Sequence, residues 1–369
     1  MNYTNELLVG ICDKLQLQPS LYELAKARYE VVSNIIESAD VFKHVSLRMY
    51  SHGSFRLKTT VKPLKENEYD LDFVVELPSD ANMEPFQLYD HIYEILTTDG
   101  VHNNMVEKKS RCIRIKYAND FHLDIMPGKA IDRKTNEIIV PDKKLQHWNH
   151  HSNPIGYAEW FENQAKTAIR KHLMEQRVLN HSAEPIEDQE VAGRLEPLRR
   201  AVQLIKRYRD LYCDRKDFTP VRSIVLCTLM GEINTSYSDE IQIIIDFCSY
   251  VNSKIKNAYN KPFIVRNPVV NEVLTEKWSE DVEIYNQFVD MMEALTIDIA
   301  KLKCATDNLS IISQLKHMFG ENVTNDVVKA YAAPISEARK IGTLSADPFG
   351  KINTTKKGTN IKKNTFYGQ

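Results

Sequence analysis

The sequence YDLDFVVEL, residues 69–77, decides the fold. Its residues alternate in polarity, which is typical of a β-strand with one buried face. Asp70 and Asp72 fall on one face, and residues 71, 73, 75 and 77 make the other face entirely apolar. In an extended strand the α-carbons of Asp70 and Asp72 lie ~7 Å apart, so both carboxylates project to the same side. Glu76 lies on that side too and is expected to be a solvated residue at the rim of the sheet.

A second acidic strand is predicted further along the chain. Residues 111–117 and 121–126 read as two strands joined by a short Ala-Asn-Asp turn, which predicts a β-hairpin. In that hairpin Asp124 shares a face with His122 and Met126. If this strand neighbours the first acidic strand, Asp124 reaches the same place as the other two carboxylates.

Carboxylates that gather at one point indicate a cation. Three of them repel each other, and a protein keeps them together when a metal ion neutralises their charge. Mg²⁺ prefers oxygen ligands and keeps positions open for water and substrate phosphate. Two such ions ~3.5–4 Å apart can hold both the attacking and the leaving oxygen of a phosphoryl displacement. We therefore prefer a catalytic metal site to the alternative that Asp70 and Asp72 are merely solvated on an exposed sheet face.

Gly53 and Ser54 precede the first acidic strand and suit the binding of a phosphate. A glycine lets backbone approach a phosphate closely, and a serine offers both an N–H and a hydroxyl group. If the residues that follow begin a helix, its amino end also favours negative charge. The order Gly-Ser, Asp-x-Asp, Asp is specific as a set, although each part alone is weak.

The remaining N-terminal pattern predicts mixed α/β structure. A long helix is expected over about residues 20–40, with Pro19 before a capping box formed by Ser20 and Glu23. A short strand is expected at 45–50, and another helix at about 85–98.

From about residue 155 the chain reads as mainly helical. Helices are expected near 156–178, 195–213, 220–231, 238–256, 270–276 and 282–303. Residues 179–197 read as a polar loop, and the last 22 residues, which contain five lysines and no acid, read as a short strand or ordered tail. The whole order predicts an α+β protein of two lobes, 1–155 and 156–369, the second ending in the basic tail.

Composition limits the classes of protein. Hydrophobic residues make up 43% and charged residues 27%, which are globular proportions. With Lys+Arg at 48, Asp+Glu at 50 and a net charge of -2, a globally basic coat for duplex DNA is excluded. No export signal and no apolar run of ~20 residues is found. Six scattered cysteines without metal-site spacing are expected to be reduced thiols, and we expect a cytoplasmic protein without membrane partners.

At these residues the chain resembles the polymerase-β-like nucleotidyltransferase superfamily, and within it the bacterial CD-NTases, relatives of cyclic GMP-AMP synthase that act in CBASS anti-phage defence. The resemblance covers nearly the whole chain. It rests on HGSFRLKTTVKP, EYDLDFVVEL, HLDIMPG, SNPIGYAEWF, LRRAVQLIKRYRD, the Pro-Val-Arg-Ser-Ile segment and NTFYG. The departures are His52 where the family often has glutamine, Lys58 where glycine is common, and Asn364 where histidine is common. None of them removes an acidic residue.

The resemblance implies a bilobed polymerase-β-like fold with residues 1–155 as the nucleotidyltransferase core. Asp70 and Asp72 would bind two Mg²⁺ ions, with Mn²⁺ as a possible substitute. Asp124 would complete the metal site on the side of the attacking hydroxyl. Gly53 and Ser54 would hold the donor triphosphate.

Two further residues are carried over from the family by motif. Lys206, in the helix LEPLRRAVQLIKRYRDLYC, matches a lysine that contacts the donor triphosphate, and the plain alternative is a solvated basic helix face. Ser223 matches a second serine on the phosphate side, and the plain alternative is a serine that begins a helix.

The implied activity is synthesis of a cyclic di- or trinucleotide messenger from ATP, GTP or both, read by a downstream effector. Some family members are conjugated through the C-terminus, and a glutamine after the final glycine leaves that open here. No sequence-specific nucleic-acid partner is expected.

Other functions stay open on the same fold. One is a template-independent polymerase, similar to poly(A) polymerases, that extends RNA, or a transferase that adds one nucleotide to a protein or small molecule. The other is a non-catalytic nucleotide sensor or toxin–antitoxin partner. The net charge counts against an RNA track, and the clustered acids count against a protein without catalysis.

Overall fold

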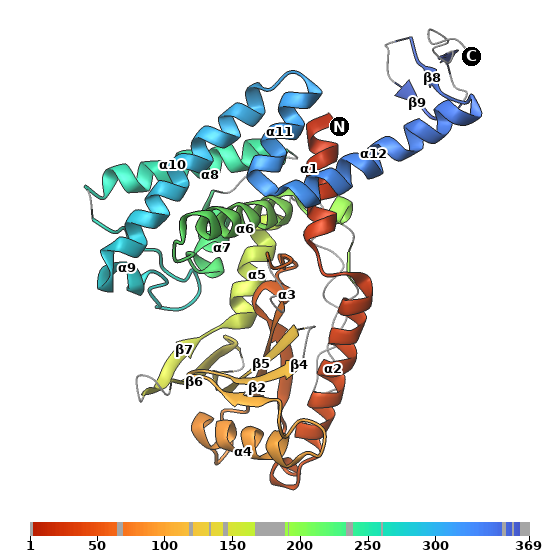
Figure 1. Cartoon of the computed structure of the whole chain (residues 1–369). Helices are drawn as coiled ribbons and strands as arrows, with labels where there is room; N and C mark the ends of the chain where they lie inside the picture. Colours follow the sequence, from red (N-terminus) through yellow and green to blue (C-terminus); the bar gives the residue numbers. More distant parts are fainter. Residues whose placement is uncertain are drawn as a thin grey trace.

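A computed structural model describes residues 3–64, 69–117, 121–132, 134–142, 147–166, 189–190, 192–233, 239–259, 261–348, 352–355 and 358–361. Figure 1 shows a β-sheet flanked by helices at one end of the molecule and a group of helices at the other. This is the α+β arrangement that the sequence predicts, with a small mixed sheet and a helical C-terminal portion. No helix in the described ranges is long and apolar enough to cross a membrane.

The sheet brings the two acidic strands together. Its strands are β1 (Arg48–His52), β2 (Tyr69–Leu77), β3 (Val106–Lys108), β4 (Ile113–Tyr117), β5 (Phe121–Asp132), β6 (Glu137–Asp142) and β7 (His147–Ser152). The main order is β1-β2-β5-β4-β3, with β6 pairing with both β5 and β7. The β2–β5 pair is parallel, and the hairpin predicted between β4 and β5 is confirmed as an antiparallel pair.

One face of the sheet is a hydrophobic core. The β2 residues Leu71, Phe73, Val75 and Leu77 are buried there with Leu123 and Ile125 of β5. Helices α2 (Pro19–Glu37) and α4 (Pro85–Thr98) contribute to the same core. This burial fixes which way β2 faces, since a slip of one residue would turn its apolar residues to the opposite side.

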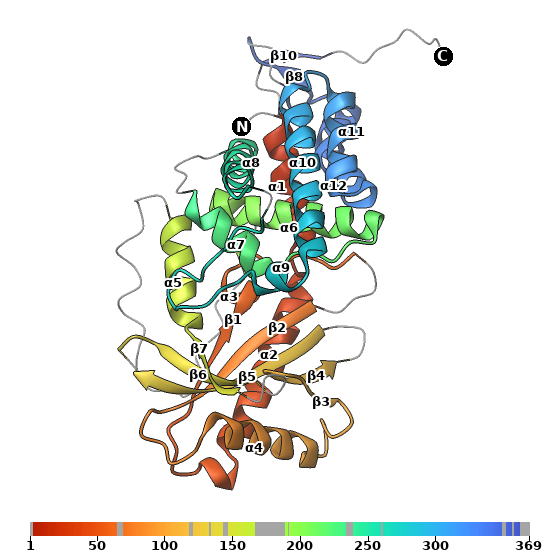
Figure 2. The same cartoon turned by 90° about the vertical axis from the view of Figure 1, so that its left-hand side faces the viewer.

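The second core lies among the remaining helices. They are α1 (Tyr3–Leu15), α5 (Pro154–Ala165), α6 (Pro197–Lys216), α7 (Ser223–Glu232), α8 (Glu240–Asn257), α9 (Glu276–Glu280), α10 (Val282–Cys304), α11 (Asn308–Phe319) and α12 (Glu321–Ile341). Figure 2 shows α6 crossing the middle of this group, between the sheet and the outer helices. Helix α1 joins this core through Leu7, Leu8 and Ile11, although the predicted boundary assigned it to the first lobe. The boundary at residue 155 itself stays a prediction.

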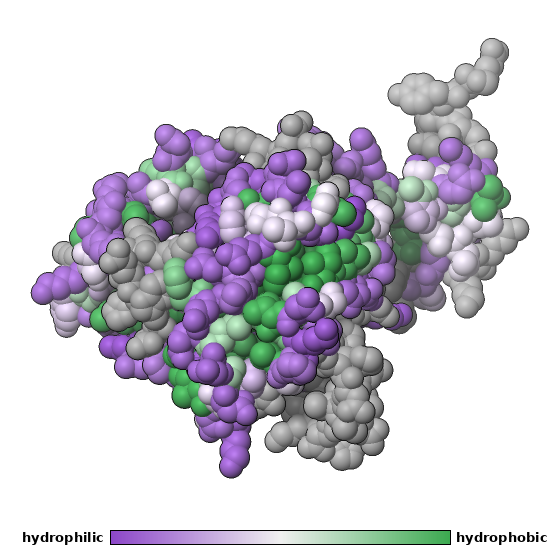
Figure 3. Space-filling model, turned by 90° about the horizontal axis from the view of Figure 1, so that it is seen from below, coloured by the Kyte–Doolittle hydropathy of each residue, from purple (hydrophilic) through white to green (hydrophobic). Residues whose placement is uncertain are grey.

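The last described residues lie away from the body of the molecule. Helix α12 leads to a small sheet of β8 (Ser345–Ala346), β9 (Ile352–Asn353) and β10 (Thr359–Asn360), with β8 in the centre. Figure 1 shows this small sheet projecting from the helical group. Seen from the α4 end, hydrophobic residues gather in a band framed by hydrophilic ones (Figure 3).

Three local predictions need correction. The long helix begins at Pro19, after an N-cap at Gln18 without a side-chain hydrogen bond, because proline suits the first turn of a helix. The predicted helix at 270–276 is absent, and the chain there makes an antiparallel bridge between Arg266 and Val273. Glu76 is buried instead of solvated, and accepts a 2.8 Å hydrogen bond from the Tyr50 hydroxyl.

Several predictions cannot be compared with the structure. The second half of the helix expected at 156–178, most of the loop at 179–197 and the NTFYG motif lie outside the described residues.

Candidate functional site

The parallel pairing of β2 and β5 places two carboxylates side by side. Asp72 is the register partner of Asp124, and Asp70 is the partner of His122. Residues on either side of these acids point into the hydrophobic core, so the acids point away from it. The structure therefore brings the three predicted acids to one face of two adjacent strands.

Burial and like charge destabilise the ionised form of Asp72. Its pKa is raised to about 7, first by burial and then by the charges of Asp124 and Asp70. On the neighbouring strand β1, His52 is the register partner of Asp72. Burial lowers the pKa of His52 to about 4, so this imidazole is neutral near pH 7 and does not offset the acids. The site holds more negative charge than these strands neutralise.

Arg114 supplies part of the missing positive charge, and sequence reasoning overlooked it. Its guanidinium donates two 2.7 Å hydrogen bonds to Asp124, one to each carboxylate oxygen, and lies 3.1 Å from Asp70. The hydrogen bonds to Asp124 raise the pKa of Arg114. Such a bidentate pair is among the strongest polar contacts a protein makes.

The acids match the chemistry of a magnesium site, although they are not gathered around one point. In the described part of the chain no three acidic, imidazole or thiol side chains converge closely enough to hold a metal ion. The Arg114 guanidinium contacts two of the three carboxylates. Nevertheless, the donors are hard oxygen atoms, and the raised pKa of Asp72 shows that a cation would be favourable here. We conclude that the residues fit Mg²⁺.

The glycine-serine turn lies against the same acids. It opens α3 (Gly53–Arg56), a helix of four residues that directly follows β1. Gly53 has a φ of 62°, and a Cβ atom at this position would overlap the Asp72 carboxylate. Glycine is thus required twice, for its backbone conformation and for space. Ser54 is partly buried, and its hydroxyl lies 3.4 Å from that of Thr60.

Lys206 is held by the loop that follows α3. Its ammonium donates hydrogen bonds of 2.9 and 3.0 Å to the carbonyl and hydroxyl oxygens of Thr59. On the same helix, Gln203 donates to the Thr60 carbonyl and Arg199 to that of Leu57. Helix α6 therefore fixes the backbone directly after the glycine-serine turn.

Ser223 is the first residue of α7, and its hydroxyl accepts a 3.0 Å hydrogen bond from Arg209. Its role on the phosphate side stays a prediction, as does that of Lys206. In the described residues both side chains are occupied by protein groups.

The basic residues of α6 between positions 199 and 209 are not a solvated face. Arg199, Arg200, Lys206, Arg207 and Arg209 are each at most 9% exposed. Their donors are satisfied inside the protein; Arg200, for instance, pairs with the buried Glu240. Burial lowers the pKa of Lys206. Periodicity could not predict this, because other helices pack around this part of α6.

Comparison with known proteins finds similar nucleotide synthases. Residues 1–165 match the model of the Second Messenger Oligonucleotide or Dinucleotide Synthetase domain. The chain is 29% identical over 369 residues to a c-di-GMP synthase of Roseivirga ehrenbergii, covering 98% of this chain and 96% of the relative. It is 24% identical to the cyclic dinucleotide synthase CdnG of Bradyrhizobium diazoefficiens, covering 88% of this chain and 82% of CdnG.

Solved structures share the fold. The structure of Bradyrhizobium diazoefficiens CdnG in complex with GTP superposes with a TM-score of 0.71 at 24% identity, covering 89% of this chain and 99% of that one. The 3′-deoxy GTP-bound form of Escherichia coli DncV gives a TM-score of 0.54 at 18% identity, covering 88% of both chains. The polymerase-β-type architecture predicted from the sequence is thereby confirmed, and these similarities support the predicted resemblance to the CD-NTase nucleotidyltransferases.

Proposed function

We propose that this nucleotidyltransferase joins and cyclises two nucleotides, with GTP as a substrate. The observation that carries the proposal is the register of Asp72 beside Asp124, with the Gly53 backbone against Asp72. The c-di-GMP synthase that is similar along almost the whole chain supports a guanine dinucleotide as the product. The GTP complex of CdnG supports a triphosphate substrate.

Asp70, Asp72 and Asp124 would hold Mg²⁺, or Mn²⁺ in its place. The bound metal would supply positive charge where the phosphoryl group is transferred. The protein's own part is to position the reactants, since phosphoryl transfer needs little covalent help from side chains. The Gly53 backbone and the Ser54 hydroxyl would bind the donor phosphates. Asp124 would face the attacking ribose hydroxyl and orient it.

Lys206 and Ser223 would act on the donor side of the same site. Lys206 holds Thr59 and Gln203 holds Thr60, so α6 would keep the glycine-serine turn in place for the triphosphate. Direct contact of the Lys206 ammonium with phosphate would require it to leave Thr59. We assign Lys206 primarily to positioning and Ser223 to the phosphate side of α7.

Arg114 is a positioning residue in this proposal. It holds Asp124 in a bidentate pair and contacts Asp70, so it keeps two acids from repelling each other. When a metal binds, the guanidinium would give up its contacts with these two acids. The same charge would then remain beside the triphosphate, where a cation is useful.

Four further expectations from the family resemblance accompany this proposal. They are a cytoplasmic location, a role in CBASS anti-phage signalling, a downstream effector that reads the product, and a partner at the C-terminus. None of them enters the argument for the chemistry.

Mass spectrometry of the reaction product tests the function. The protein would be incubated with all four nucleoside triphosphates and Mg²⁺, with and without an RNA primer. We expect a cyclic dinucleotide that resists phosphatase, formed from GTP without primer. Nucleotides that appear only in lengthened RNA would show the template-independent polymerase instead. A linear dinucleotide that keeps its 5′-triphosphate, as the sole product, would refute cyclisation.

A further inference from the structure

A cavity lies in the helical part of the protein, away from the carboxylates of the sheet. Its volume is about 360 Å³, at the small end of the range for ligand sites. The lining residues come from α6, α10 and α11; they are Tyr208, Tyr212, Arg215, Lys216, Ala294, Ile297, Asp298, Lys301 and His317. No residue of the site at the sheet is among them.

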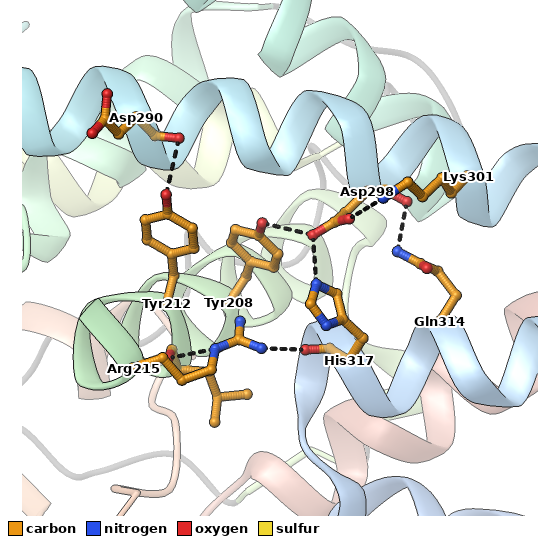
Figure 4. A network of polar contacts seen from close by, with 9 residues as sticks. Tyr208, Tyr212, Arg215, Asp290, Asp298, Lys301, Gln314 and His317 are labelled. Atoms are coloured by element: carbon orange, nitrogen blue, oxygen red, sulfur yellow. Dashed lines mark hydrogen bonds and ion pairs between the residues drawn. The ribbon is translucent and has the colours of Figure 1, made fainter.

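The floor of the cavity is a polar network in which the carboxylate of Asp298 has hydrogen-bond partners. Its carboxylate accepts a 2.9 Å hydrogen bond from the Tyr208 hydroxyl, and lies 3.0 Å from the His317 ring and 3.4 Å from the Lys301 ammonium (Figure 4). Although burial alone would raise it, these partners hold the pKa of Asp298 below its usual value. The buried carboxylate is therefore charged and satisfied, and it fixes the side chains around it.

The rim of the cavity is positively charged. Arg215, Lys216 and Lys301 are permanent cations, and Asp298 is the single carboxylate among the lining residues. Arg215 is held in place by the carbonyl oxygens of Leu211 and His317. The remaining donors of these exposed cations suit an anion, and guanidinium and ammonium groups are typical ligands of phosphate.

The walls suit a flat ring. Tyr212 stacks on Tyr208, with ring centroids 6.0 Å apart and an angle of 16° between their planes, and because Tyr208 is 1% exposed, the partly buried Tyr212 presents the aromatic surface. Ala294 and Ile297 of α10 add apolar surface, and Ile297 is 55% exposed. Aromatic side chains of this kind bind nucleobases by stacking, with little dependence on the base.

We propose that this cavity is a second ligand site, which binds an anion of the nucleotide class, with its ring on the tyrosine and isoleucine walls and its phosphate on Arg215 and Lys216. A mononucleotide and a cyclic dinucleotide both carry a base and a phosphate, so both are used as probes. This proposal does not depend on the activity proposed above, because it concerns binding at residues that take no part in that chemistry.

Calorimetric titration of the full chain with GMP tests the site. The parent protein carries Asp70→Asn and Asp72→Asn, so that the carboxylate site binds no metal and no turnover occurs. Arg215→Ala with Lys216→Ala removes the rim charge, and Ile297→Trp fills the cavity from an exposed position. The matched control is Lys329→Ala with Arg339→Ala, which removes the same two charges from exposed positions on α12.

We expect saturable binding of GMP that weakens at least tenfold in both cavity variants and changes less than twofold in the control. Inorganic phosphate should bind at least tenfold more weakly than GMP. Titration with c-di-GMP then shows whether the cavity prefers a cyclic dinucleotide or a mononucleotide. Tighter binding of either ligand supports the site.

Two results would overturn the proposal. One is the absence of saturable binding of either nucleotide to the parent, and the other is unchanged affinity in the cavity variants. Phosphate that binds as tightly as GMP would contradict the role of the ring. A wild-type protein that makes no cyclic dinucleotide would refute the proposed function and leave these titrations as they are.

Discussion

Two carboxylates of this protein, the partly buried Asp72 and the buried Asp298, have opposite electrostatic surroundings. Asp72 faces two other acids, and burial together with their charge raises its pKa to about 7. Asp298 faces Tyr208, His317 and Lys301, which hold its pKa below the usual value in spite of burial. Burial acts in the same direction on both pKa values, so the difference comes from their partners.

The acids at the sheet have too few partners to balance their charge, whereas Asp298 has enough. Buried polar groups are normally satisfied within the protein, as Asp298 is. A cluster of acids whose charge is only partly balanced, by Arg114, is costly for stability, and such perturbed groups gather at functional sites. The charge of the acids at the sheet is thus only partly balanced, whereas the network at Asp298 contains its own balancing partners.

The largest effect is expected from Asp70→Asn combined with Asp72→Asn. Loss of two metal ligands should lower the rate of product formation by roughly a thousandfold or more, since a metal supplies several kcal/mol of charge stabilisation. The melting temperature without divalent cations should stay equal or rise, because like charges are removed. Chromatography of the product and thermal unfolding check both parts. Asp80→Asn, at an exposed position of the same lobe, is the matched control, and full activity of the double variant would refute the site.

Replacing Arg114 should reveal its part in balancing the acids. Without divalent cations, Arg114→Gln should lower the free energy of unfolding by about 1–3 kcal/mol, because Asp124 is left buried and unpaired. With the competing guanidinium gone, Mn²⁺ should then raise the melting temperature by more than it does in the wild type. The control is Lys116→Gln, which removes a cation of the same strand that pairs with Glu107. A smaller Mn²⁺ effect in Arg114→Gln than in the control would contradict the assigned role.

The two carboxylates should also respond to pH in opposite ways. The folded-state pKa of Asp72 is raised, so its contribution to stability is lost as pH rises from about 4 to about 7. The folded-state pKa of Asp298 is lowered, so its contribution is present above the unfolded pKa and is lost as pH falls through the folded one. Without divalent cations, Asp72→Asn should therefore gain stability relative to wild type between pH 5 and pH 8, by ~1–2 kcal/mol, a pKa unit being worth 1.36 kcal/mol.

Denaturant titrations across this pH range check the prediction. Asp298→Asn is the counterpart, and it should lose stability relative to wild type at neutral pH and less of it below pH 4. Parallel pH profiles for the two variants would show that the carboxylates do not differ in the way described.

The smallest effect is expected for one of two neighbouring tyrosines at the Asp298 network. Tyr208→Phe should cost about 1.5–3 kcal/mol of unfolding free energy, because it removes a hydrogen bond to a charged, buried group. Tyr212→Phe removes a hydroxyl that lies 3.4 Å from a carbonyl near the surface, and it should cost less than 1 kcal/mol. Equal losses in these matched variants would mean that Asp298 does not depend on the Tyr208 hydroxyl.

Much of the sheet site could be predicted from the sequence, because the pattern of the strands is strong. The alternation in residues 69–77 gives the direction of Asp70 and Asp72, and the hairpin gives that of Asp124. The same hairpin also contained a signal for Arg114. A three-residue turn between Tyr117 and Phe121 places Arg114 opposite Asp124, as the structure shows. Reading the register of the hairpin, and not only its existence, would have found this residue.

The rest depended on tertiary packing that local patterns do not report. The basic residues of α6 between positions 199 and 209 are buried because α1, α8 and α11 pack against that helix, whereas a charged helix face normally indicates solvent. The segment 270–276 has the composition of a short helix, but the backbone of Asn267 and Glu272 closes a turn instead. Helices α1, α11 and α12 were not predicted, although α1 buries Leu7, Leu8, Ile11 and Leu15 at helical spacing.

The parallel pairing of β2 and β5 has a practical consequence for engineering. Parallel neighbours require a long excursion of the chain between them, and here residues 78–120 make it by way of α4, β3 and β4. The turn at Gly100 is exposed, and nothing lies within 4 Å of a side chain built there. A fluorescent reporter or affinity tag inserted at that turn would lengthen the excursion at little entropic cost and leave the adjacency of Asp72 and Asp124 intact.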